Sequence, residues 1–211
     1  MAIPEWLQPL ADALIAPDAF GFLRQPLPED PSLRRAAVLI LFGEGPDGPD
    51  VLLLQRSDDL RSHAGQPAFP GGQLDPDDDG AVGAALREAQ EETGVDPSGV
   101  EVFAVLPELW VPPSAHAVTP VVAWWRTPSD VGPGDPLEVA AVARVPISAL
   151  VDPANRLSVR HSSGFLGPAF RVADMLVWGF TAGVLDRLLT LAGWDVGWDH
   201  DRVETLPAQA G

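Results

Sequence analysis

The stretch GGQLDPDDDGAVGAALREAQEETGV, residues 71–95, predicts a helix that carries three glutamates along one edge. At about 100° of rotation per residue, Glu88, Glu91 and Glu92 fall within one arc, and small and aliphatic residues form the adjoining stripe. An acidic DDDG turn precedes the helix, where carboxylates suit the positive end of the helix dipole, and Gly94 is a typical left-handed C-cap. One flank of this helix therefore packs against the core and the other carries charge.

The glutamate edge predicts a site for a divalent metal ion. Arg87 and Glu91 are four residues apart and can pair along the helix, which leaves Glu88 and Glu92 to converge on a cation from successive turns. Oxygen ligands of this kind suit Mg²⁺ or Mn²⁺. A solvated acidic helix face is the alternative. The preceding Gly71-Gly72 pair, expected in a turn after a strand, favours the metal site because glycine lets backbone carbonyls approach a ligand closely.

The segment REAQEETGV, residues 87–95, resembles the second half of the Nudix box, G-x5-E-x7-R-E-U-x-E-E-x-G-U, in which U is aliphatic. The first half departs from that pattern. Between Gly72 and Asp79 there is one residue more than the usual spacing, and an aspartate stands where the first box glutamate is expected. The chain is thereby identified as similar to the Nudix hydrolases, and the longer loop resembles their coenzyme A diphosphatase branch.

A second motif of that branch lies just upstream, in LLLQRSDDLRSHAGQPAFPGG, residues 52–72. It keeps Arg56, Ser57 and Arg61 at the spacing of the family and differs at Leu54, where the family usually has threonine. The resemblance implies a Nudix α/β/α sandwich with a mixed β-sheet between helices. It also implies metal-dependent hydrolysis of the diphosphate linkage of coenzyme A or acyl-coenzyme A, which yields adenosine 3′,5′-bisphosphate and 4′-phosphopantetheine or its acyl form.

The same resemblance assigns roles to residues of the glutamate helix. Glu88 and Glu92 are expected to be the principal metal ligands, Glu91 a further ligand or water contact, and Arg87 the residue that holds the carboxylates in register. A backbone carbonyl of the Gly71-Gly72 pair can complete the metal shell. In this family the general base comes either from the box helix or from a glutamate on a later loop.

Glu138, after a glycine- and proline-rich segment, is the candidate for a base outside the helix, and its alternative is an ordinary solvent-facing residue. Arg56 and Arg61 are expected to bind the phosphates of the substrate as planar forks, and an exposed surface pair is the competing interpretation. Ser57 belongs to the same motif. His63 either contacts a phosphate or has a structural role in the loop, and we favour the structural role.

Composition limits the remaining possibilities. With 211 residues and 46% hydrophobic content, the chain can bury a substantial core and is expected to form a single domain. Within residues 1–211 we expect a helical N-terminal extension (1–34), a core (35–195) and a loosely held tail (201–211). The absence of cysteine excludes disulfides, thiolate metal sites and cysteine nucleophiles.

Net charge bears on partners and location. A formal charge of −17 and the absence of lysine argue against nucleic acid as a partner, because phosphate-backbone binding needs clustered cations. The N-terminus lacks a basic region before its apolar residues, and no apolar run approaches the length of a membrane span, so no membrane association and a cytoplasmic location are expected. The partner is expected to be a small-molecule substrate, and the resemblance implies a possible homodimer.

Strands interleaved with helices predict an α/β fold. We expect helices over residues 5–15, 146–150 and 173–191, a hairpin of residues 35–42 and 51–55, strands over 100–106, 118–125 and 138–145, and two short strands within 157–172.

Two other functions remain open from sequence. A Nudix enzyme acting on ADP-ribose, a dinucleotide or a nucleoside triphosphate would carry the same glutamate helix. A non-catalytic domain that senses a nucleotide metabolite is the alternative from another class, and the intact glutamates argue against it.

Overall fold

A computed structural model describes residues 3–16, 19, 21, 26–30, 32–58, 64–112, 114–162 and 164–206. Two of the expected substrate contacts, Arg61 and His63, lie outside the described residues. Within the described part, alternating sheets and flanking helices confirm the predicted α/β class. No helix in these ranges is long and apolar enough to cross a bilayer.

The first sheet is built on a long hairpin. β1 (Arg34–Gly45) turns at residues 46–47 into β2 (Gly48–Arg56), and β1 also pairs in parallel with β7 (His116–Trp125). Among the described residues this mixed sheet has eight strands with the central order β3-β2-β1-β7-β5. The remaining members are β3 (Pro67–Ala68), β4 (Gly71–Gln73), β5 (Val100–Val105), β6 (Leu109–Val111) and β8 (Val139–Pro146).

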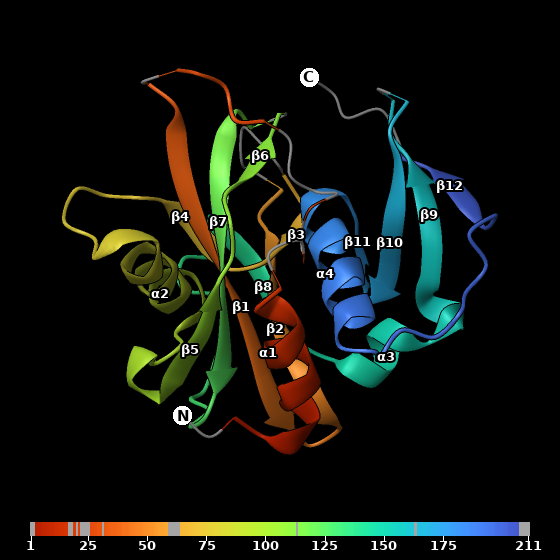
Figure 1. Ribbon diagram of the computed structural model, residues 1–211, viewed down its shortest axis with the longest axis horizontal. Helices are drawn as coiled ribbons and strands as arrows, with labels where there is room; N and C mark the ends of the chain where they lie inside the picture. The colour runs from red at the N-terminus through yellow and green to blue at the C-terminus, as the bar shows by residue number, and fades with distance from the viewer. Residues whose placement is uncertain are drawn as a thin grey trace.

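Successive residues of the hairpin point to opposite faces of this sheet, and both faces are buried. Leu39, Leu41 and Leu52 pack under α2 (Gly80–Thr93) on one face. Ile40 and Phe42, on the opposite face, join a larger core with α1 (Gln8–Leu14) and α4 (Gly179–Leu191). Figure 1 shows α2 on one side of the sheet and α1 and α4 on the other. A strand buried on both faces reads as a continuous apolar run, which is what RAAVLILF does.

A second sheet lies beyond α4 in Figure 1 and has the order β11-β10-β9-β12 in the described part of the chain. Its strands are β9 (Arg156–Arg160), β10 (Leu166–Val172), β11 (Met175–Val177) and β12 (Val203–Thr205). Short helices connect the elements: η1 (Glu5–Leu7), η3 (Pro97–Gly99), α3 (Ile147–Val151) and η4 (Pro153–Asn155).

Arg156 joins this second sheet to α4. Its side chain is fully buried, and its guanidinium donates to Asp186 of α4 and, at 2.8 Å, to Asp195 just beyond that helix. The guanidinium also lies over the rings of Phe170 and Trp198, with centroids 4.6 and 4.7 Å away. Two carboxylates and two aromatic faces thus compensate the buried positive charge of Arg156.

The structure differs from the sequence-based expectations in four places. The helix expected from residue 173 begins only at Gly179, because Ala173 and Asp174 have positive φ values of 49° and 58° and form the tight turn between β10 and β11. The Gly71-Gly72 pair lies in β4, paired with β1, instead of in a turn. Residues 109–111 form β6 within an expected loop, and residues 203–205 pair with β9 within the expected loose tail.

We predict that Arg156→Met lowers the free energy of unfolding by about 3 kcal/mol, because it leaves Asp186 and Asp195 without their shared cation. Urea unfolding followed by tryptophan fluorescence measures the change. Arg160→Met, at the exposed end of the same strand, is the matched control and should change stability by less than about 0.5 kcal/mol. Equal stability of the two variants would contradict the anchoring role of Arg156.

Candidate functional site

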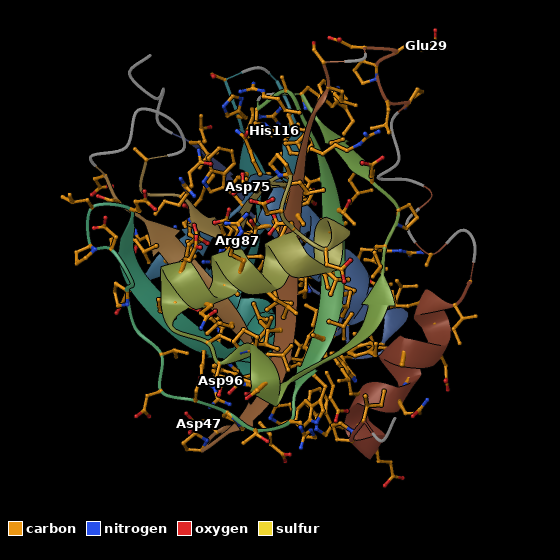
Figure 2. All side chains as sticks on the ribbon, turned by 90° about the vertical axis from the view of Figure 1, so that its left-hand side faces the viewer. Glu29, Asp47, Asp75, Arg87, Asp96 and His116 are labelled. Carbon is orange, nitrogen blue, oxygen red and sulfur yellow. The ribbon has the colours of Figure 1, made fainter. Side chains whose placement is uncertain are left out.

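Helix α2 crosses one face of the first sheet and carries the predicted glutamates (Figure 2). Ala84, Ala85 and Ala89 face the sheet and are fully buried, and their small side chains let the helix lie close to the strands. The helix ends as expected at Gly94, which has φ 76° and donates its N–H to the carbonyl of Gln90 at 2.9 Å.

Glu92 is the most buried of the glutamates, with 8% of its side chain exposed. Its Oε2 accepts the backbone N–H of Gly71 at 2.9 Å, and its Oε1 lies 3.6 Å from Nη1 of Arg56. Burial raises the pKa of Glu92 to about 7, because the charged form loses its hydration, while the Gly71 hydrogen bond and the Arg56 charge act in the opposite direction. The charges of Glu88 and Glu138 raise this pKa further.

Glu88 lies one turn earlier and packs directly against Gly72. A Cβ at Gly72 would lie 2.2 Å from Oε1 of Glu88, so a larger residue in β4 would displace the carboxylate. Burial is also the main reason why the pKa of Glu88 is raised, opposed by a hydrogen bond from Arg87. The structure therefore places the carboxylate of Glu92 against Gly71 and the carboxylate of Glu88 against Gly72.

Arg87, labelled in Figure 2, connects the loop before the helix to the glutamates. Its Nη1 donates to Glu88 at 3.0 Å and to Glu91 at 3.3 Å, whereas its Nη2 donates to the carbonyl of Gln73 at 3.1 Å. Its Nε and Nη2 both donate to Asp78, at 2.9 and 3.0 Å. This is the fork geometry that arginine has and lysine lacks.

Asp78 is the site residue that sequence reasoning missed. The acidic turn was expected to place carboxylates at the positive end of the helix dipole, but Asp79 at the N-cap makes no side-chain cap hydrogen bond, and Asp78 turns toward Arg87. Its hydrogen bonds with Arg87 lower the pKa of Asp78, so the carboxylate stays charged. The signal available in the sequence was the aspartate near the position of the first box glutamate, opposite the box arginine.

Glu138 is exposed in the turn just before β8, and its charge acts on Glu92. Its carbonyl accepts the N–H of Ser57 at 2.8 Å, and the next residue, Val139, pairs with Arg56 in the sheet. The structure therefore brings Arg56, Ser57 and Glu138 near the C-terminal end of α2, where the buried Glu92 lies. Glu91, in contrast, is 60% exposed and contacts Arg87.

The charge and burial of the glutamates decide whether a cation suits this site. No group of three or more acidic or histidine side chains in the described part of the chain already encloses a metal-sized space. Glu88 and Glu92, however, are neighbouring carboxylates whose charges are both opposed by burial. A divalent cation between such a pair would relieve their repulsion, and the backbone of Gly71 and Gly72 lies beside both carboxylates.

The pKa of Glu92 predicts a pH-dependent stability of the metal-free protein. The pKa of Glu92 is about 7 in the folded protein and near 4.5 in an exposed glutamate. The contribution of Glu92 to the free energy of unfolding is therefore fully present below pH 4.5 and is lost as the pH rises through 7. The glutamine of Glu92→Gln does not titrate. The free energy of unfolding of this variant, relative to that of the wild type, should therefore rise by about 3 kcal/mol between pH 4.5 and 8.

Urea unfolding in the presence of a chelator, at pH 4.5 and pH 8, measures this difference. Glu91→Gln, at an exposed position of the same helix, is the control and should follow the wild type at both pH values. An advantage of Glu92→Gln that is the same at both pH values would contradict the raised pKa.

Comparison with known proteins agrees with these features. The sequence matches the family described as the NUDIX domain over residues 32–163. The protein named uncharacterized Nudix hydrolase NudL from Escherichia coli K12 is 41% identical over 173 residues, which cover 76% of this chain and 83% of that protein. NudL from Shigella flexneri serotype 5b is 39% identical over 188 residues, covering 82% of this chain and 91% of the relative.

Among solved structures, the Nudix hydrolase RenU from M. smegmatis has the same fold, with a TM-score of 0.54 and 21% sequence identity. The similar region covers 80% of this chain and 91% of the RenU chain. The family match spans the hairpin, the glutamate helix and Glu138, and the NudL relatives exceed one third identity over most of their length. The chain that places Glu88 and Glu92 against Gly71 and Gly72 thus belongs to the Nudix hydrolase family.

Proposed function

We propose that this Nudix hydrolase uses Mg²⁺ or Mn²⁺ to cleave the diphosphate linkage of coenzyme A or acyl-coenzyme A. The products would be adenosine 3′,5′-bisphosphate and 4′-phosphopantetheine or its acyl form. The observation that carries the hydrolase part is the pair of buried carboxylates, Glu88 and Glu92, packed against the backbone of β4. The substrate is inferred from the motif of residues 52–72, which ends in that same strand.

In this proposal Glu88 and Glu92 hold the cation, and Glu91 contacts it or its water. When bound, the cation would neutralise charge on the diphosphate and lower the pKa of a water molecule. Arg87 keeps Glu88 oriented through its bond at 3.0 Å and is itself oriented by Asp78. These residues act before any bond changes, by setting where charge can be neutralised.

Arg56 is suited to hold a phosphate of the substrate. Its Nε is buried and has no hydrogen-bond partner within the described ranges, and its Nη1 is only 3.6 Å from Glu92. A phosphate oxygen would give this guanidinium an acceptor beyond those that the described residues provide. Ser57 follows it and is buried, so it fixes the end of the strand from which Arg56 projects.

Glu138 is suited to accept the proton of the attacking water, because its carboxylate is exposed and lies near the buried end of the glutamate helix. The water oxygen forms a bond to phosphorus, the bridging P–O bond breaks, and the second phosphate leaves with the bridging oxygen. Glu138 would thereby be the base from a later loop that the sequence left open.

Incubation of the protein with coenzyme A, acyl-coenzyme A, ADP-ribose, NADH, dinucleoside polyphosphates and nucleoside triphosphates, with Mg²⁺ or Mn²⁺, tests the proposal when products are resolved by mass. We expect coenzyme A species to be cleaved fastest. Faster cleavage of ADP-ribose or another nucleotide would contradict the substrate assignment. A lack of cleavage of every compound would contradict the hydrolase itself and favour a sensor.

Glu92→Gln should lower kcat on the best substrate on the order of 100-fold, because it removes a charged ligand from the cation site while its oxygen can still accept from Gly71. Circular dichroism checks that the fold is kept. A kcat near that of the wild type would contradict the role of Glu92 as a metal ligand.

Asp78→Ala should lower kcat roughly 10-fold to 100-fold, because it removes the carboxylate that accepts two of the hydrogen bonds orienting Arg87. Steady-state kinetics on the best substrate measure the loss. Asp77→Ala, at an exposed position of the same turn, is the matched control and should remain close to the wild type. Similar kinetics for the two variants would contradict the orienting role of Asp78.

A further inference from the structure

The C-terminal end of α2 is held by a loop from much later in the chain. The last carbonyls of a helix have no partner within it. Gly132 donates its N–H to the carbonyl of Thr93 at 3.0 Å, and Gly134 donates to the carbonyl of Glu92 at 3.0 Å. We call residues 131–138 the clasp loop; the chain between β7 and β8 passes this end of α2 in Figure 2.

The two glycines of the clasp loop differ in how closely they approach the helix. A Cβ at Gly134 would lie 1.8 Å from the carbonyl oxygen of Glu91, a distance that no side chain can occupy. A Cβ at Gly132 would have no atom within 4 Å. Neither residue has a positive φ, so the backbone of both can accept alanine and only the contact at Gly134 requires glycine.

The other end of the clasp loop is tied to the strand that carries Arg56. Asp135 closes a tight turn by accepting the N–H of Leu137 on its side chain at 2.9 Å and the N–H of Glu138 on its carbonyl at 2.9 Å. Glu138 then accepts from Ser57 through its own carbonyl at 2.8 Å. Pro133 and Pro136 restrict the backbone between these anchors.

Glu138 therefore ends a short segment that is hydrogen-bonded to the glutamate helix at Gly134 and to Ser57, next to β2, at Glu138 itself. Its distance from Glu92 depends on how closely Gly134 approaches the helix, because few freely rotating bonds lie between Gly134 and Glu138. A bulky residue at 134 would push the loop away from the carbonyl of Glu91 and carry the carboxylate of Glu138 with it.

We propose that Gly134 is a positioning residue for the hydrolysis: its close approach to the last turn of α2 sets the place of Glu138 relative to the glutamates of that helix. This inference rests on the proposed function, in which Glu138 accepts the proton of the attacking water. Gly134 itself touches neither substrate nor cation. Its role is to fix two carboxylate-bearing elements, separated by more than forty residues, in one register.

Gly134→Ala and Gly132→Ala are matched variants of the same loop. Gly134→Ala should lower kcat about 10-fold to 100-fold with KM changed by less than about 3-fold, because the displacement affects the base and leaves Arg56 in place. Gly132→Ala should stay within about 3-fold of the wild type in both constants. Steady-state kinetics on the best substrate, with thermal unfolding as a check of the fold, give these numbers.

The double variant Gly134→Ala/Glu138→Gln separates positioning from a general structural defect. If Gly134 acts through Glu138, the double variant should be no slower than Glu138→Gln alone. Losses that multiply, a Gly134→Ala variant that behaves like Gly132→Ala, or a Glu138→Gln variant with wild-type kcat would each overturn the inference. A wild type that cleaves nothing on the panel would instead overturn the proposed function.

Asp135→Ala provides the same test without a steric clash, in case Gly134→Ala does not fold. It removes the acceptor of the Leu137 N–H and loosens the turn before Glu138, while the bonds to α2 remain. We expect a smaller loss of kcat, unchanged KM, and again no further loss when Glu138→Gln is added. Additive losses in this pair would overturn the inference as well.

Discussion

The hydrogen bond from the Gly71 N–H to the carboxylate of Glu92 is the contact on which the arrangement of the site depends. It joins the glutamate helix to β4, and β4 is in turn paired with β1 at the centre of the first sheet. A Cβ at Gly71 would lie 2.3 Å from the carbonyl of Ala37, so this strand can lie in its place only with glycine there. A buried carboxylate is tolerated because it has a fixed donor and the Arg56 charge beside it.

Burial of negative charge is energetically unfavourable, and a few arginines compensate the charge of the buried carboxylates. The chain has no lysine, and the arginine of the glutamate helix uses several donors at once. Arg87 makes contact with Asp78, Glu88, Glu91 and the carbonyl of Gln73, which a point charge on a flexible stem could not do at once. Arg56 retains a buried Nε without an acceptor among the described residues.

The rigidity of the first sheet explains how distant segments meet at the site. Residues from β2, β4, α2 and the start of β8 converge there, and each is fixed by pairing or packing: Arg56 next to Val139 across the sheet, and Ala85 and Ala89 against the strands. The second sheet, beyond α4, is held by the buried Arg156 and lies mostly outside the region matched by the family. Sites built on paired strands and packed helices keep their geometry better than sites on loops alone.

The sequence alone determined the α/β class, the glutamate helix, the hairpin and the family, because these depend on local periodicity and on motifs with fixed spacing. Local periodicity placed Ala85 and Ala89 on the packed side of α2, since a 3.6-residue repeat fixes which side chains share an edge. Only the tertiary structure decided which carboxylates are buried, that Asp78 pairs with Arg87 instead of capping the helix, and that Gly134 is pressed against Glu91. Those features depend on contacts between segments far apart in the chain, and no local pattern records the distance between them.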